Sequence, residues 1–125
     1  MITKILTLTL GSTLGGLSRY CLAGLIYRWF GALFPYGTLA VNLSGCLFIG
    51  FLSSIVEKKF LLSPNDRLLW MTGFCGAFTT FSTFILETSN LLKDGETTRA
   101  FMNIILSITL GFILFKFGEI IGKII

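Results

Sequence analysis

Four long apolar stretches, separated by short polar ones, dominate the chain. They lie at about residues 5–27, 37–56, 68–92 and 100–122. Each is close to the ~20 residues that an α-helix needs to cross the hydrocarbon core of a bilayer. The polar breaks carry charges, prolines and glycines, and all of them are short. This pattern predicts an all-α membrane protein in which four transmembrane helices form a single domain over residues 1–125.

The third stretch contains residues that disfavour a continuous helix in lipid. Its middle holds glycines and clustered hydroxyl side chains, namely Gly73, Gly76, Thr79, Thr80, Ser82 and Thr83. Irregular backbone at membrane depth is tolerated only where protein buries it or where it lines a polar cavity. We therefore expect the third helix to be broken in mid-membrane, with free carbonyl groups near an ion site.

Composition places the chain in a membrane. Only 13% of its residues are charged and its mean hydropathy is +0.85, whereas about a quarter of the residues of a soluble domain are charged. Histidine is absent, and no predicted span holds paired carboxylates, so an enzyme is not expected. The three cysteines lie one per span without a CxxC spacing, which favours reduced thiols. We expect a multi-pass protein of the cell membrane that has lipid, and no nucleic acid, as a partner.

Loop charges leave the orientation of the chain nearly undecided. An even number of spans places both termini on one side, which would carry Lys4, Lys58, Lys59, Arg67 and Lys123, against Arg28, Lys93 and Arg99 on the other. This bias is weak under the positive-inside rule, so the chain could insert in both orientations and pair with itself antiparallel. Four helices also enclose little space, so a pore would need a second copy.

Two polar residues within the spans are candidates for function. Arg19 lies in the first span, where a charge is costly and normally faces a cavity or a partner, although it could also snorkel to the headgroups. Asn42 lies in the second span, and its amide offers two donors and one acceptor. These donors suit an anion, but the amide could equally form an interhelical hydrogen bond.

Phe81 and Phe84 follow the predicted break and share one face of a helix at i, i+3 spacing. The edge of an aromatic ring carries partial positive charge. It can favour a small anion without holding it as tightly as an ammonium group would, as a conducting site requires. The other interpretation is that both rings only pack between helices.

Three motifs resemble the Fluc (CrcB) family of fluoride channels. The string GFCGAFTTFSTF at 73–84 is similar to the family's third-span signature, GTLAVNLSG at 37–45 to its second-span motif, and GGLSRY at 15–20 to its first-span motif. The resemblance covers all four spans, although the fourth matches more loosely. It implies antiparallel, dual-topology dimers with two pores that let fluoride leave the cytoplasm passively and so lower its toxicity.

The resemblance also implies roles for individual residues. Phe81 and Phe84 would line the anion path, Asn42 would donate to fluoride, and Arg19 would lie near the aqueous vestibule. On the fourth span, Ser107 falls where a hydroxyl of the family's polar track is expected. Asn103 stands one turn earlier, where a tyrosine is common, so the detail of this track departs from the family pattern.

A central Na⁺ is a further implication of the resemblance. The backbone carbonyls of Gly76 and Thr79 from each subunit would hold it at the two-fold axis, and the ion would be structural rather than transported. Ala77 replaces a glycine that is often seen after Gly76, which is a mild change at the break.

Two other classes of protein stay open on the residues alone. A small dual-topology, proton-coupled drug or metabolite antiporter has a similar size but needs a carboxylate in the membrane, and only Glu87 lies well inside a span. A non-transporting membrane subunit would use its polar residues only to join helices. For a channel, the second copy could be an identical chain or a paralogue.

Overall fold

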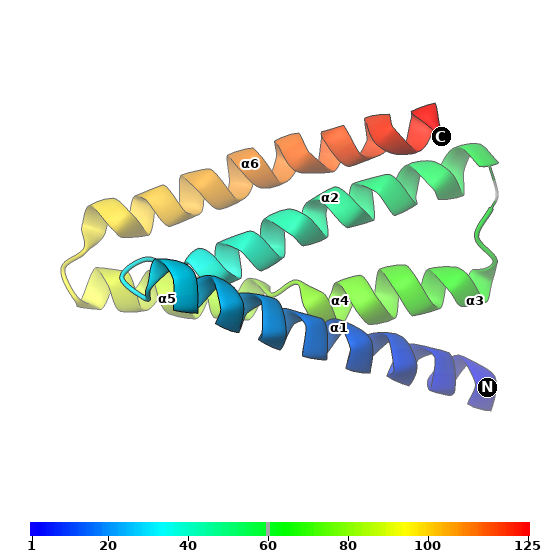
Figure 1. Cartoon of the computed structure of the whole chain (residues 1–125), viewed down its shortest axis with the longest axis horizontal. Helices are drawn as coiled ribbons and strands as arrows, with labels where there is room; N and C mark the ends of the chain where they lie inside the picture. Colours follow the sequence, from blue (N-terminus) through cyan, green and yellow to red (C-terminus); the bar gives the residue numbers. More distant parts are fainter. Residues whose placement is uncertain (60) are drawn as a thin grey trace.

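All regular secondary structure in the described residues is helical, which confirms the predicted all-α class. The structure is a computed structural model that describes residues 1–59 and 61–125. Its elements are α1 (Ile2–Phe30), α2 (Tyr36–Lys59), α3 (Pro64–Arg67), the π-helical segment η1 (Leu68–Cys75), α4 (Gly76–Phe78), α5 (Phe81–Lys93) and α6 (Thr97–Ile124). Both termini lie at the same end of the bundle (Figure 1).

Three helical stretches of the described residues are long and apolar enough to cross a membrane. They are Tyr36–Glu57, Pro64–Lys93 and Thr97–Ile124. Helix α1 is 29 residues long but is not among them, because Arg19 and many threonines, serines and glycines lower its mean hydropathy. A membrane crossing by α1, and with it the count of four spans, stays a prediction.

Helices α2 and α6 lie side by side along their length (Figure 1). Glycines make this contact close: a Cβ added at Gly118 would collide with the Leu47 carbonyl, and one at Gly50 would collide with the Phe115 carbonyl. Small residues let helix backbones approach in this way, and van der Waals packing then stabilises the pair. We call this contact the α2–α6 seam.

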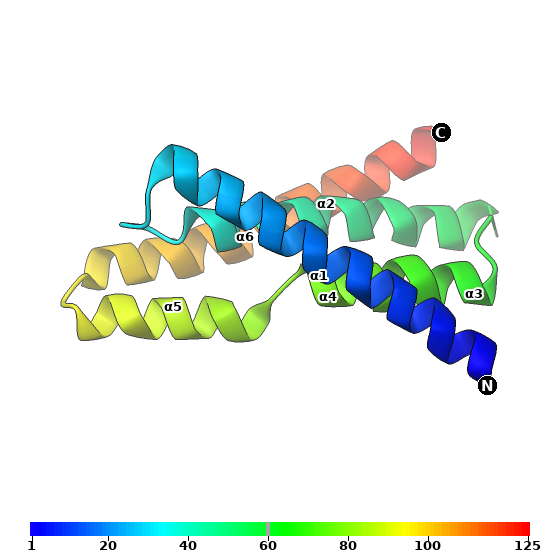
Figure 2. The same cartoon turned by 60° about the horizontal axis from the view of Figure 1, so that its bottom comes forward.

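Helix α1 crosses the third stretch in the same close manner (Figure 2). A Cβ at Gly11 would meet the Leu69 carbonyl, and one at Gly15 would meet the Phe74 carbonyl. The GxxxG pair of α1 therefore packs directly on the backbone of η1, and α1 is fixed beside the segment that precedes the interruption.

The third stretch is interrupted at two residues in its middle. Helix α4 ends at Phe78, Thr79 and Thr80 are extended with ψ of 156° and 114°, and α5 begins at Phe81. Upstream, η1 forms a π-helix, which the sequence pattern did not predict. The depth of the interruption in a bilayer stays a prediction.

Candidate functional site

The amide of Asn42 holds the interruption in place. Its Nδ2 donates to the Thr80 carbonyl at 3.1 Å, and its Oδ1 accepts from the Thr80 N–H at 2.8 Å. The interhelical hydrogen bond considered for Asn42 is therefore present, and it pairs both backbone groups of one extended residue. One N–H of the amide is left for another acceptor, so the role of donor to an anion stays a prediction.

The four carbonyls from Gly76 to Thr79 lose their usual helical donors at the interruption. In a continuous α-helix the Gly76 carbonyl would accept from the Thr80 N–H, and the Thr79 carbonyl from the Thr83 N–H. The Thr80 N–H instead donates to Asn42, and the Thr83 N–H donates to the Thr80 hydroxyl at 3.3 Å. The family resemblance implies the carbonyls of Gly76 and Thr79 as ligands of a Na⁺, which stays a prediction.

A cavity of about 320 Å³ opens beside the interruption, between α2, α5 and α6. Of the seven predicted site residues, five line this cavity: Asn42, Thr79, Phe81, Phe84 and Ser107. The ring centroids of Phe81 and Phe84 are 6.0 Å apart, but the two rings differ in exposure, with Phe81 76% exposed and Phe84 only 9%. The lining contains hydroxyls and one amide but no charged side chain, so it offers weak donors to a ligand.

Asn103 links Ser107 to the helix that carries Phe84. Its Oδ1 accepts from the Ser107 hydroxyl at 3.5 Å, and its Nδ2 donates to the Thr88 hydroxyl at 2.9 Å. Thr88 in turn donates to the Phe84 carbonyl at 2.7 Å. Asn103 is 2% exposed, so the residue that departs from the family pattern is a buried connector between α5 and α6. Sequence reasoning noted the substitution but missed the connection.

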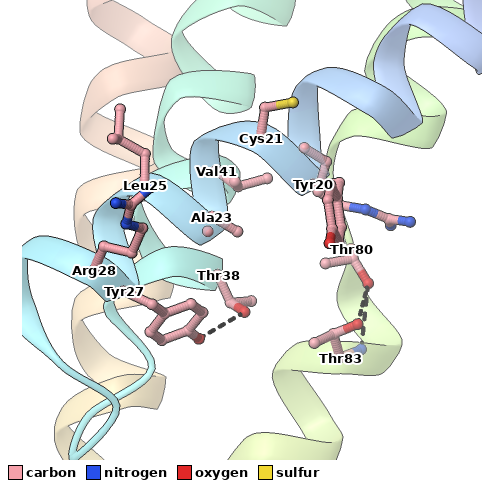
Figure 3. A pocket seen from close by; sticks show the side chains of 12 residues that line it. Tyr20, Cys21, Ala23, Leu25, Tyr27, Arg28, Thr38, Val41, Thr80 and Thr83 are labelled. Carbon is pink, nitrogen blue, oxygen red and sulfur yellow. Dashed lines mark hydrogen bonds between the residues drawn. The ribbon is translucent and has the colours of Figure 1, made fainter.

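Arg19 lies apart from the other predicted residues. It lines a second cavity of about 820 Å³ between α1, α2 and α5, whose other side chains include Tyr27, Thr38 and Thr83 (Figure 3). Thr80 lines both cavities, so the two are adjacent at the interruption. Gly76 is exposed and lines neither of them.

Side-chain clusters typical of metal sites are not found in the described residues. No group of three or more Cys, Asp or Glu residues is close enough there to hold a metal ion. The oxygens that the interruption offers are backbone carbonyls and threonine hydroxyls, and oxygen ligands suit hard cations.

The long apolar helical stretches define a multi-pass membrane protein. The family described as CrcB-like protein, Camphor Resistance (CrcB), matches residues 6–119. The chain belongs to this family, and the resemblance seen in the motifs is confirmed.

Relatives of nearly the same length carry the name fluoride-specific ion channel FluC. The protein of Maridesulfovibrio salexigens is 42% identical over 98% of this chain and 97% of the relative. The protein of Chlorobium phaeobacteroides is 43% identical over 91% of this chain and 88% of the relative, and that of Nitrosococcus oceani is 40% identical over the whole of both.

Proposed function

We propose that the protein is a fluoride-specific ion channel through which fluoride leaves the cytoplasm passively. The observation that carries the proposal is the cavity beside the interruption, which brings Asn42, Phe81, Phe84 and Ser107 together. Hydroxyl, amide and ring-edge groups replace part of the hydration of a small anion, yet none of them binds it as tightly as an ammonium group would. The relatives named as fluoride-specific channels support the same ion, and they do not favour an antiporter.

The working form of this channel would be an antiparallel dimer. Phe81 is 76% exposed and Gly76 is exposed on a single chain, so the cavity wall and the interruption are both open on one side. A second copy in the opposite orientation would cover these surfaces and complete two pores, and the near-even loop charges permit such insertion. The partner is either an identical chain or a paralogue.

A structural Na⁺ at the dimer axis would satisfy the backbone at the interruption. The carbonyls of Gly76 and Thr79 have lost their helical donors to Asn42 and Thr80, and in lipid such groups need another partner. Two copies would bring four carbonyl oxygens together. The ion would also contribute positive potential between the two pores without entering either of them.

Fluoride efflux from proteoliposomes tests the channel function. We expect the purified protein to release fluoride but not chloride, and Phe81→Ile, Phe84→Ile and Asn42→Leu each to collapse the fluoride flux. Phe101→Ile is the matched control, because Phe101 is 58% exposed on α6 and lines neither cavity. Near-normal flux in the three folded site variants would refute the anion path.

Orientation-locked variants test the dimer. Two lysines added to one loop should fix one orientation, and function should return only when an oppositely locked copy is co-expressed. Full activity of a single locked variant would refute the antiparallel arrangement.

Assembly without Na⁺ tests the structural ion. Dimers assembled in N-methylglucamine buffer should be inactive, whereas reversal of the Na⁺ gradient across an assembled channel should not drive fluoride. Full activity after Na⁺-free assembly would refute the cation site and leave the channel assignment untouched.

A further inference from the structure

A three-residue hydrogen-bonded cluster lies at the end of the bundle where α1 meets α2. The Glu87 Oε1 accepts from the Thr38 hydroxyl at 2.9 Å and from the Tyr27 hydroxyl at 3.1 Å. The two hydroxyls are themselves 3.4 Å apart (Figure 3). The three side chains come from α1, α2 and α5, and they lie outside the set of residues considered for the anion path.

The other carboxylate oxygen of Glu87 has no such support. Oε2 is buried and has no hydrogen-bond partner in the described residues. The ion pairs found there are Arg99–Glu96 and Lys116–Glu119, so Glu87 takes part in none of them. The two hydroxyls are therefore the groups that hold this carboxylate.

Glu87 lies on α5 at a position from which its side chain can face either of the two cavities. Residues three and four apart are neighbours on a helix surface, so Glu87 lies between the columns of Phe84 and Thr83. Phe84 lines the cavity beside the interruption, whereas Thr83 lines the one beside α1. The carboxylate can be directed to either side, and the hydroxyls of Tyr27 and Thr38 hold it on the side of α1 and α2.

The Tyr27 ring packs directly against the backbone of α2 at Gly37. A Cβ added at Gly37 would come within 2.7 Å of Tyr27 Cδ2 and 2.8 Å of the Ala23 carbonyl oxygen. The ring thus packs flush against the first turn of α2, next to Thr38, and its hydroxyl is directed to Glu87. A larger residue at position 37 would displace it.

We propose that Tyr27 and Thr38 are positioning residues that hold the Glu87 carboxylate away from the anion path. The proposal rests on the proposed channel function. Without the two hydroxyls, the buried carboxylate has no partner on the side of α1 and is free to turn toward the Phe84 side of α5, which faces the neighbouring cavity. Its negative charge then opposes the anion that the cavity is suited to hold.

A double-mutant comparison on two backgrounds tests this role. Tyr27→Phe with Thr38→Val keeps the volumes and removes both hydroxyls, and it should lower fluoride efflux from liposomes by roughly tenfold, the scale of hydrogen bonds to a charged group. On the Glu87→Gln background, the same two substitutions should change the flux by less than about twofold, because no charge is left to redirect. Thr38→Ser, which keeps the hydroxyl, should conduct normally.

The outcomes separate this proposal from the channel assignment. An equal loss of flux on both backgrounds would mean that Tyr27 and Thr38 act through packing. An unchanged flux when both hydroxyls are removed from the protein with Glu87 intact would mean that they do not position the carboxylate. Either result overturns the proposal. Size-exclusion chromatography of each variant confirms that dimers are compared. If the unmodified protein released no fluoride, the channel assignment itself would fail.

Discussion

Helix α2 makes two contacts of opposite character. In the α2–α6 seam, backbone meets backbone because Gly50 and Gly118 carry no side chain. At the interruption, the side chain of Asn42 meets the backbone of Thr80 through two hydrogen bonds. The seam depends on close backbone packing, whereas the interruption depends on hydrogen bonds. Substitutions can therefore disturb the packing of the helices and the candidate site independently.

The largest effect is expected in the seam. Gly118→Ala should lower the free energy of unfolding in detergent by about 3 kcal/mol, because the new Cβ would press on the Leu47 carbonyl, which cannot move without α2. Gly111→Ala on the same helix is the control, since its Cβ would lie 3.4 Å from the Cys46 sulfur, which is an ordinary van der Waals contact. An equal loss of unfolding free energy in the two variants would mean that the close backbone contact at Gly118 does not determine the stability of the seam.

A smaller loss of stability is expected at the interruption. Asn42→Leu keeps the volume but leaves the N–H and carbonyl of Thr80 without partners, at a cost of about 1–2 kcal/mol. The same unfolding measurement checks it, and faster hydrogen exchange at the Thr80 amide would locate the change. An unaltered amide exchange rate would show that Asn42 does not hold the interruption.

Replacement of Asn103, the buried connector on α6, should lower the free energy of unfolding by less than replacement of Asn42. Asn103→Leu removes the bonds to Thr88 and Ser107, and we expect a loss of about 0.5–1 kcal/mol, the usual scale of hydrogen bonds between membrane helices. If Asn103 also orients Ser107 at the cavity, then fluoride flux falls more than stability does. If the fluoride flux falls only in proportion to the unfolding free energy, then Asn103 stabilises the contact between α5 and α6 and does not orient Ser107.

The smallest effect is expected at the Lys116–Glu119 ion pair near the end of α6. Lys116 and Glu119 lie 2.9 Å apart at i, i+3 spacing, and Lys116 is 53% exposed. Glu119→Gln should change the unfolding free energy by less than about 0.5 kcal/mol, because the pair lies near the end of its span, where the long Lys116 side chain can extend to the membrane surface and be solvated without Glu119. A loss comparable to that of Asn42→Leu would show that this helix end has a partner.

The sequence was sufficient for the helices and for much of the cavity. Each apolar stretch is a long helical region because span length and polar punctuation are local signals, and the motif residues Asn42, Phe81, Phe84 and Ser107 do meet. Local signals could not reveal which groups pair across helices. Glu87 lies 60 residues from Tyr27 and 49 from Thr38, and nothing in the spacing of three separate helices indicates such a cluster.

The sequence pattern also could not predict the π-helical segment η1. Residues 68–75 are uniformly apolar apart from Thr72 and Gly73, so their periodicity does not distinguish one kind of helix from another. Contacts with another helix also act on this segment, since Gly11 and Gly15 of α1 lie directly against its backbone at Leu69 and Phe74.

The two extended residues at the interruption also set two helix ends against each other. The helical run that ends at Phe78 presents the negative pole of its macrodipole there, and α5 presents its positive pole from Phe81, each equivalent to roughly half an elementary charge. These partial charges belong to the peptide groups, so they do not titrate and no side-chain replacement removes them. An anion beside Phe81 and a cation beside Phe78 would thus both be stabilised by a field that disappears only if the chain between them becomes one continuous helix.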